Sequence, residues 1–251
     1  MIRTVGDRPF VRSQYCGAMP QLPTPVYAGL LLRSVPAPVR RDAHAALGAL
    51  APWGHVTPQL VQDSGGGVAD HDLHVDGLLV QLPYRLSHPW PSSTRTARMS
   101  GRARTVLAAW MTRSERAGTR QRAVRELFAS DEPWTAPFVI ALCGEYVYEI
   151  GADVLGFVCG ELVQRDDLRA AYARFLRDNP SFLAVLRRRA VSFRHLDHRW
   201  PHRDEPGRIY PQLAALDALG MLGHGGRVPG HEVRGPAPRH ALVSTNGAGP
   251  V

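Results

Sequence analysis

The chain has 251 residues, of which 44 % are hydrophobic and 21 % charged, so its composition supports a packed core and excludes a wholly disordered protein. Thirty basic residues against 22 acidic ones give a formal net charge of +8. The 24 Gly and 21 Pro are many for a compact fold but form no collagen-like repeat.

Cysteine content and hydropathy bear on the compartment. Three cysteines, Cys16, Cys143 and Cys159, are too few for a disulfide framework, which favours a reducing environment. The N-terminal segment has no apolar core of a signal peptide. The longest apolar zone, 137–159, carries three acidic residues, which argues against a membrane span. We therefore expect a cytoplasmic protein with no membrane partner.

Residues 1–97 are expected to form a weakly structured N-terminal region. Eleven of the 21 prolines fall within residues 1–95, and no Glu occurs there. Proline lacks an amide hydrogen and fixes φ, so this spacing interrupts regular elements repeatedly. A short helix is predicted over 40–50 and strand-length apolar runs over 25–35 and 73–86, whereas 88–98 has the composition of a linker.

Residues 98–222 have helical periodicity and predict a mainly α fold, a bundle of four to six helices. Helical patterns cover 102–128 with a break at Gly118, then 134–163, 166–178, 181–200 and 210–222. The segment 134–163 is apolar nearly all round and is predicted to be one continuous buried helix. Residues 223–251 contain seven Gly and four Pro and are expected to form a disordered tail. We expect the bundle to fold on its own from Met99.

Two stretches of the bundle, PFVIALCGEYVYEI (137–150) and ARFLRDNPSFLAVLRRRAVSF (173–193), resemble a group of uncharacterised helical proteins from high-GC actinobacteria. The shared features are a Gly-Glu-Tyr-Val helix and a Phe-Leu-x-x-Asn-Pro-x-Phe junction, and the resemblance covers about 130–220. It implies a helical fold for this part and carries no activity, cofactor or site residue.

The excess positive charge is concentrated in one segment. Residues 96–129 carry eight Arg against Glu115 and Glu126. An amphipathic helix with an arginine-rich face can lie on a phosphate backbone or on an acidic protein. The candidate partner-binding residues are Arg102, Arg104, Arg113, Arg116, Arg120 and Arg122. A second interpretation stays open: every basic residue is Arg and none is Lys, which a GC-rich genome explains, and the segment is then an ordinary solvated helix.

Three acidic residues, Glu145, Glu149 and Asp153, follow one another at i, i+4 and i+8, which places them on one side of the predicted buried helix. Like charges at this spacing repel, so arginines such as Arg187, Arg188 or Arg189, water, or a cation must offset them. We predict neutralisation by arginine, with no metal and no cofactor. The alternative is a metal site that also uses His195 and His198, which are three residues apart.

The leading hypothesis is a non-enzymatic helical interaction module that binds an acidic protein or nucleic acid weakly. The alternative is a carboxylate and histidine metal-dependent enzyme built in the bundle core. No P-loop, Rossmann fingerprint or nucleophile motif occurs, so the sequence indicates no particular enzyme class. Whether the protein is an enzyme stays open.

Overall fold

The computed structural model describes residues 24–50, 55–57, 72–196 and 209–226, and it shows the mainly α fold expected from the sequence. The tail expected over 223–251 lies outside the described residues from 227 onward. His198 also lies outside them.

The N-terminal part of the chain combines helices with short strands. Its elements in chain order are α1 (Thr24–Arg33), the 3-10 turn η1 (Ala37–Val39), α2 (Arg40–Ala49), β1 (His55–Thr57), β2 (Asp72–Val75), β3 (Leu78–Gln81), β4 (Arg85–Ser87) and α3 (Ser93–Ala97). Two antiparallel pairs form, β1 with β4 and β2 with β3. The tight turn of the β2–β3 hairpin contains Asp76 and Gly77, both with positive φ.

The remainder is helical. Its elements are α4 (Gly101–Met111), α5 (Ala117–Phe128), η2 (Pro133–Thr135), α6 (Ala136–Ala141), η3 (Leu142–Gly144), α7 (Tyr148–Cys159), η4 (Leu162–Gln164), α8 (Asp166–Asp178), α9 (Pro180–Leu196) and α10 (Pro211–Gly223). The described bundle thus numbers seven α-helices, α4 to α10, because the long helix expected over 134–163 is divided.

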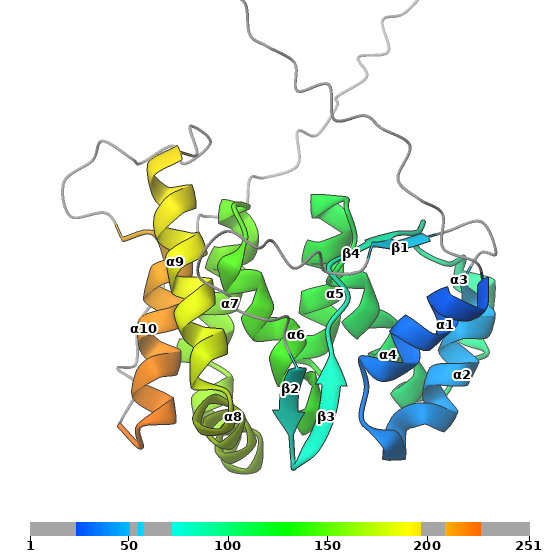
Figure 1. Cartoon of the computed structure of the whole chain (residues 1–251), viewed down its shortest axis with the longest axis horizontal. Coiled ribbons are helices and arrows are strands. Elements are labelled where there is room, and N and C mark those ends of the chain that lie inside the picture. Colours follow the sequence, from blue (N-terminus) through cyan, green and yellow to red (C-terminus); the bar gives the residue numbers. More distant parts are fainter. Residues whose placement is uncertain (1–23, 51–54, 58–71, 197–208, 227–251) are drawn as a thin grey trace, which may run out of the picture.

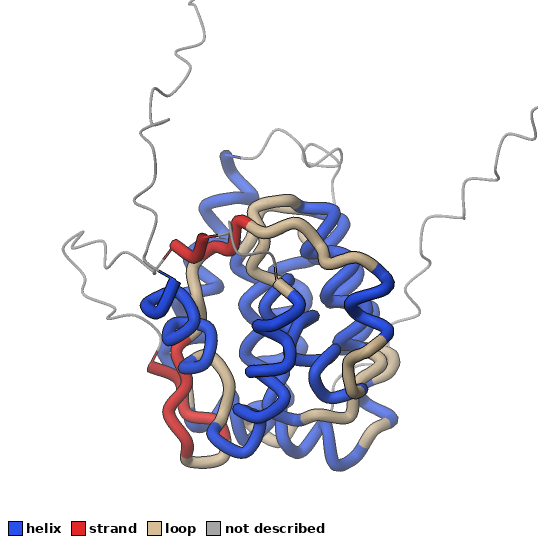
Figure 2. Tube along the Cα trace, turned by 90° about the vertical axis from the view of Figure 1, so that its right-hand side faces the viewer, coloured by secondary structure: helices blue, strands red, loops and turns tan. Residues whose placement is uncertain are grey.

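The elements are arranged along the long axis of the molecule (Figure 1). Helices α9 and α10 lie at one end, and α1 to α4 lie at the other, with α5, α6 and α7 between them. Turned by 90°, the helices stand side by side while the strands cover one side and the top (Figure 2). Helix α10 packs against α7, α8 and α9, and α4 packs against α2 and α5.

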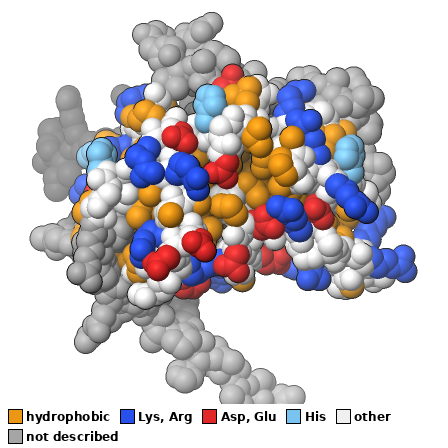
Figure 3. Space-filling model, turned by 90° about the horizontal axis from the view of Figure 1, so that it is seen from below, with side chains coloured by type: hydrophobic (Ala, Val, Ile, Leu, Met, Phe, Trp, Pro, Cys, Tyr) orange, Lys and Arg blue, Asp and Glu red, His pale blue; other side chains and the backbone are white. Residues whose placement is uncertain are grey.

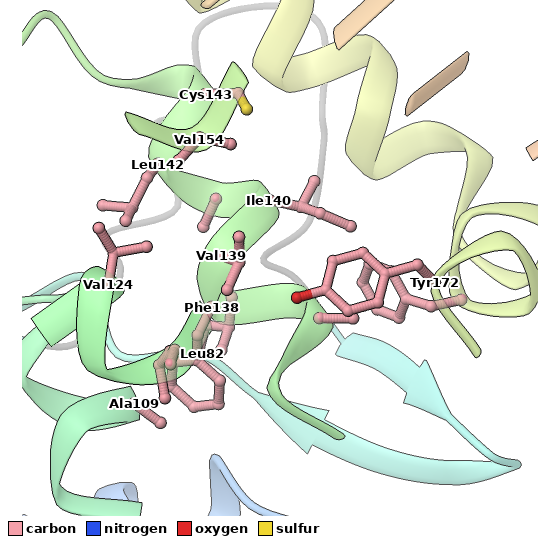
Figure 4. Close-up of a cluster of buried hydrophobic side chains, with 14 of the residues drawn as sticks. Leu82, Ala109, Val124, Phe138, Val139, Ile140, Leu142, Cys143, Val154 and Tyr172 are labelled. Atoms are coloured by element: carbon pink, nitrogen blue, oxygen red, sulfur yellow. The ribbon is translucent and has the colours of Figure 1, made fainter. Parts of the chain in front are cut away.

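One hydrophobic core extends from α1 and α2 through the β2–β3 hairpin and β4 to α10. Phe138, Val139, Ile140 and Leu142 at its centre are fully buried (Figure 4). At the α8–α9 junction the Phe175 and Phe182 rings pack edge to face, 5.9 Å apart. None of the described helices has the length and apolar character needed to cross a membrane.

The described part of residues 1–97 contributes directly to this core. Leu31, Val39, Val80 and Leu86 are buried in the same cluster as the bundle residues. The helix expected over 40–50 and the strands expected within 73–86 are present, whereas 25–35 forms helix α1 and not a strand. The apolar run there was too short for its periodicity to distinguish helix from strand. The boundary expected at residue 98 therefore does not separate two cores.

The prediction of a single helix over 134–163 is wrong at residues 142–147. Helix α6 tightens into a 3-10 turn that ends at Gly144, and Glu145 is extended, with φ −115° and ψ 162°. A Cβ on Gly144 would lie 2.5 Å from Leu186 Cδ2, so glycine lets α9 approach here. Gln212 of α10 donates to the carbonyl groups of Glu145 and Val147 and so ties α10 to the break.

Asn179 joins the α8–α9 junction to the β2–β3 hairpin. Its side-chain oxygen accepts a hydrogen bond from His74 N, and its Nδ2 donates to the His74 carbonyl, both at 2.8 Å. The same Nδ2 donates to the carbonyl of Phe175, 2.8 Å away. The amide therefore satisfies the outer edge of β2 as a neighbouring strand would, and it gives the Asn-Pro junction a structural role.

We predict that a chain beginning at Met99 loses cooperative unfolding. This truncation removes the buried residues of α1, α2 and the strands and exposes the apolar face of α4 that α2 covers and the part of α8 that β2 covers. Urea titration followed by circular dichroism measures the effect, and a chain beginning at Thr24, which keeps every described element, is the matched control. Cooperative unfolding from Met99 at an unchanged midpoint would contradict the shared core.

A second prediction concerns Asn179. Replacing it by Asp keeps the shape and the acceptor but removes both donated hydrogen bonds and places a carboxylate against two carbonyl groups. We expect the free energy of unfolding to fall by about 2–3 kcal/mol. The neighbouring exposed Asp178→Asn is the control and should change it by less than about 0.5 kcal/mol. Equal effects at the two positions would argue against the link to β2.

Candidate functional site

The most unusual group in the described core is a carboxylate held by three arginines. Glu145 is 4 % exposed and lies at the break between α6 and α7. Arg85 Nη1 is 2.5 Å from Glu145 Oε1, Arg113 Nη1 is 3.3 Å from the same oxygen, and Arg120 Nε is 2.8 Å from Oε2. We call these four residues the Glu145 cluster. It joins β4, the end of α4, the first half of α5 and the α6–α7 break.

Backbone carbonyl groups fix two of these arginines in place. Arg113 donates through Nε to the carbonyl of Pro83 and through Nη2 to that of Tyr84. Arg120 donates through Nη1 to the carbonyl groups of Ser114 and Glu115. Burying a guanidinium group costs free energy unless it is paired and hydrogen-bonded. These contacts offset that cost, and they hold Arg113 against the turn before β4 and Arg120 against the turn between α4 and α5.

The protonation energetics show that positive charge exceeds negative charge in the cluster. Burial lowers the pKa of Arg113 to about 10, the Glu145 charge opposes this shift, and Arg85, Arg120 and Arg189 add to it. Burial also disfavours the charged form of Arg85, but the Glu145 carboxylate more than offsets this and raises its pKa. One carboxylate therefore lies within 3.3 Å of three guanidinium groups, and the guanidinium of Arg189 acts electrostatically on one of them, that of Arg113.

Glu145 does not lie on the helix of the other two acids of the predicted ladder, whereas Glu149 and Asp153 are both in α7, four residues apart. Glu145 lies in the break, and Asp153 of α7 is bound by Arg125 at 2.8 Å and by Gln121 at 2.9 Å. Glu149 is exposed in the first turn of α7. The partners of Glu145 and Asp153 thus come from β4, α4 and α5, and not from Arg187, Arg188 or Arg189 of α9 as expected. The prediction from the i, i+4 and i+8 spacing requires one continuous helix, and the break separates Glu145 from that helix.

The alternative metal site is not assembled in the described part of the chain. His195 is exposed in the last turn of α9, whereas Glu145 and Asp153 are bound by separate sets of arginines. The described residues contain no group of three or more His, Cys, Asp or Glu side chains placed to hold a metal ion.

Burial makes the Cys143 thiol and the Tyr172 hydroxyl poorly reactive. Burial raises the pKa of the Cys143 thiol to about 12, which keeps it protonated at neutral pH. Burial likewise raises the pKa of the Tyr172 hydroxyl, which bonds to Thr135. Neither has the properties of a nucleophile.

The six arginines predicted to bind a partner divide by burial. Arg113 and Arg120 belong to the Glu145 cluster and are 6 % and 1 % exposed, so they cannot form a surface for a macromolecule. The other four are exposed. Of these, Arg102 pairs with Glu132, and Arg122 pairs with Glu126 and lies over the Trp90 ring at 4.0 Å. Arg104 and Arg116 have no side-chain partner among the described residues.

An open pocket of about 700 Å³ lies where α2, α3 and the start of α4 meet. We call it the basic pocket. Its charged lining residues are Arg41, Arg95, Arg98 and Asp42, and small residues of α2 together with Met99 and Ser100 complete it. Ser100 Oγ accepts from Ala103 N, which caps α4, and donates to Asp42 at 2.8 Å. Arg95 Nη1 donates to the carbonyl of Ala49, 3.3 Å away.

Sequence reasoning missed the residues that form this pocket. The stretch 88–98 resembled a linker, yet it contains α3 and two of the pocket arginines. The available signal was charge: from Ser93 to Met111 the sequence contains four Arg and no acid. Seen from below, basic side chains are prominent at the end of the molecule formed by α1 to α4 (Figure 3).

Comparison with protein-family models, with curated proteins and with solved structures found no match to this chain.

We predict that Glu145→Gln lowers the free energy of unfolding by about 3–5 kcal/mol, because it leaves buried arginines without their counter-charge. The matched control is Asp153→Asn, which breaks a pair whose Arg125 side chain is 59 % exposed and should cost about 1 kcal/mol or less. Urea unfolding of both variants measures the difference. A cost below 1 kcal/mol for Glu145→Gln would show that the cluster does not hold these elements together.

Proposed function

We propose that the protein is a non-enzymatic helical interaction module that binds the phosphate groups of a nucleic acid, weakly and without sequence preference, through the basic pocket. The observation that carries the proposal is the convergence of Arg41, Arg95 and Arg98 on one open pocket that contains a single acid, Asp42. These are three guanidinium groups from three separate segments, α2, α3 and the turn before α4.

The state of these side chains supports binding from solution. All three arginines are exposed, and neither Arg41 nor Arg98 is bound to another side chain among the described residues. A guanidinium group binds phosphate oxygens through pairs of N–H donors, and its free energy of binding comes largely from the release of counterions. The exposed Arg104, one turn further along α4, extends the positive charge beyond the pocket.

Nucleic acid is favoured over an acidic protein because the lining provides charge with few apolar anchors. Protein interfaces depend on a desolvated centre of aromatic or aliphatic side chains, whereas the pocket presents Ala45, Gly48 and Ala49 between its arginines. A phosphate backbone needs only positive charge at suitable intervals. We also propose a cytoplasmic location, which the free, buried thiols of Cys143 and Cys159 support.

The test is fluorescence anisotropy with a labelled single-stranded oligonucleotide and a labelled duplex, over a series of salt concentrations. We expect weak binding of both, of equal strength for unrelated sequences, and a steep loss of affinity as salt increases. The double variant Arg95→Gln/Arg98→Gln should lower affinity about tenfold or more and reduce the slope of log K against log salt by about 2.

The matched control is Arg177→Gln, which removes another exposed arginine, in the last turn of α8, and should leave affinity nearly unchanged. Equal losses for the pocket variant and the control would indicate nonspecific attraction by the net charge and would contradict a site. Binding of a labelled poly-glutamate peptide, with no binding of either oligonucleotide, would replace nucleic acid by an acidic protein as the partner.

A further inference from the structure

The Glu145 cluster contains more positive charge than its single carboxylate can balance. Arg85, Arg113 and Arg120 all lie within 3.3 Å of Glu145, which leaves a formal surplus of two positive charges in a mostly buried group. Arg189 of α9 is half-buried, acts electrostatically on Arg113, and has no side-chain partner among the described residues. An uncompensated buried charge is costly, so a cluster of this kind favours an additional anion.

Donor groups in the cluster also remain unused. Arg120 is 1 % exposed, and its Nη2 has no hydrogen-bond partner in the described structure. Its Nε makes an ion pair with Glu145 whose angle is not that of a hydrogen bond. Buried polar groups in proteins are nearly always hydrogen-bonded, and each exception calls for an explanation such as an ion.

The cluster reaches the surface at Arg85. The side chain of Arg85 is 20 % exposed, and only its Nη1 is bound to Glu145. Its guanidinium carbon lies 5.3 Å from the centre of the exposed Tyr84 ring, and the hydroxyl of Tyr146 is close enough to influence its charge. At this edge the remaining donors of Arg85 meet an anion from solution, and Arg189 of α9, which acts electrostatically on Arg113, adds positive charge to the cluster.

We propose that the Glu145 cluster binds one phosphate dianion at the exposed edge of Arg85, with Arg189 as the second contact. A phosphate group carries about −1.5 to −2 charge at neutral pH, which matches the surplus of two. Its oxygens accept the paired N–H donors that guanidinium groups present. The phosphate is either the free ion or the phosphoryl group of a small phosphate monoester, and it is distinct from the nucleic acid proposed for the basic pocket.

The experiment compares thermal unfolding of the full chain in sodium phosphate and in sodium chloride of equal ionic strength. One saturable phosphate site should raise the midpoint by about 3–6 °C at a phosphate concentration about ten times the dissociation constant. Isothermal titration should give one phosphate per chain. A second titration with a simple alkyl phosphate monoester distinguishes the two sources of phosphate. If the monoester binds more tightly than the free ion, the ligand is the phosphoryl group of a larger molecule. If it binds more weakly, the ligand is the free ion.

Variants locate the site. Arg85→Gln should abolish the shift caused by phosphate, and Arg189→Gln, which leaves all ion pairs of Glu145 intact, should weaken binding about tenfold even if Arg85→Gln does not fold. Arg98→Gln is the matched control in the basic pocket and should keep the full shift. Loss of the shift in Arg98→Gln with its retention in Arg189→Gln would move the phosphate to the basic pocket and overturn the proposal. No difference between phosphate and chloride in the unmodified protein would also overturn it.

Discussion

The pairing of one buried carboxylate with three arginines constrains the whole arrangement. Glu145 takes its partners from β4, from the end of α4 and from α5, and Arg113 further fixes the turn before β4 by binding two of its carbonyl groups. A charge in a nonpolar interior tolerates little displacement of its partners. The helices on either side can therefore approach only in the register that brings all four side chains together.

That pairing also explains why the chain breaks its central helix. Glu145 has an extended backbone between α6 and α7, and a continuous helix over 134–163 would replace it with a helical one. The side chain would then point in a different direction from the one in which it meets its three arginines. Local pattern could not show this, because the segment is apolar nearly all round and favours a helix throughout. The close approach of Leu186 at Gly144 and the hydrogen bonds from Gln212 to the carbonyl groups of Glu145 and Val147 come from residues more than 40 positions away.

The contrast between local signals and contacts with distant residues also explains which elements could be predicted from the sequence and which could not. Helices α8 and α10 begin and end close to their predicted bounds, because Asp166, Asn179 and Pro211 act on the chain locally. The prolines of residues 1–97 predict a weakly structured region, yet its described segments are held by distant partners. His74 is fixed by Asn179, 105 residues away, and Arg85 by Glu145, 60 residues away. The periodicity of the sequence cannot predict contacts between residues so far apart.

The degree of burial decides whether an arginine can bind a macromolecule or only a small anion. The sequence gives all 30 basic residues the same identity, so a count cannot distinguish a structural arginine from a binding one. Arg85 of the Glu145 cluster is 20 % exposed and bound by a buried carboxylate, whereas Arg98 is exposed and has no side-chain partner among the described residues. A macromolecular backbone can reach only the second kind. A small anion gains more from the first, because electrostatic attraction is stronger where water is excluded. The two proposed ligands, a nucleic acid and a phosphate ion, follow from this difference in depth.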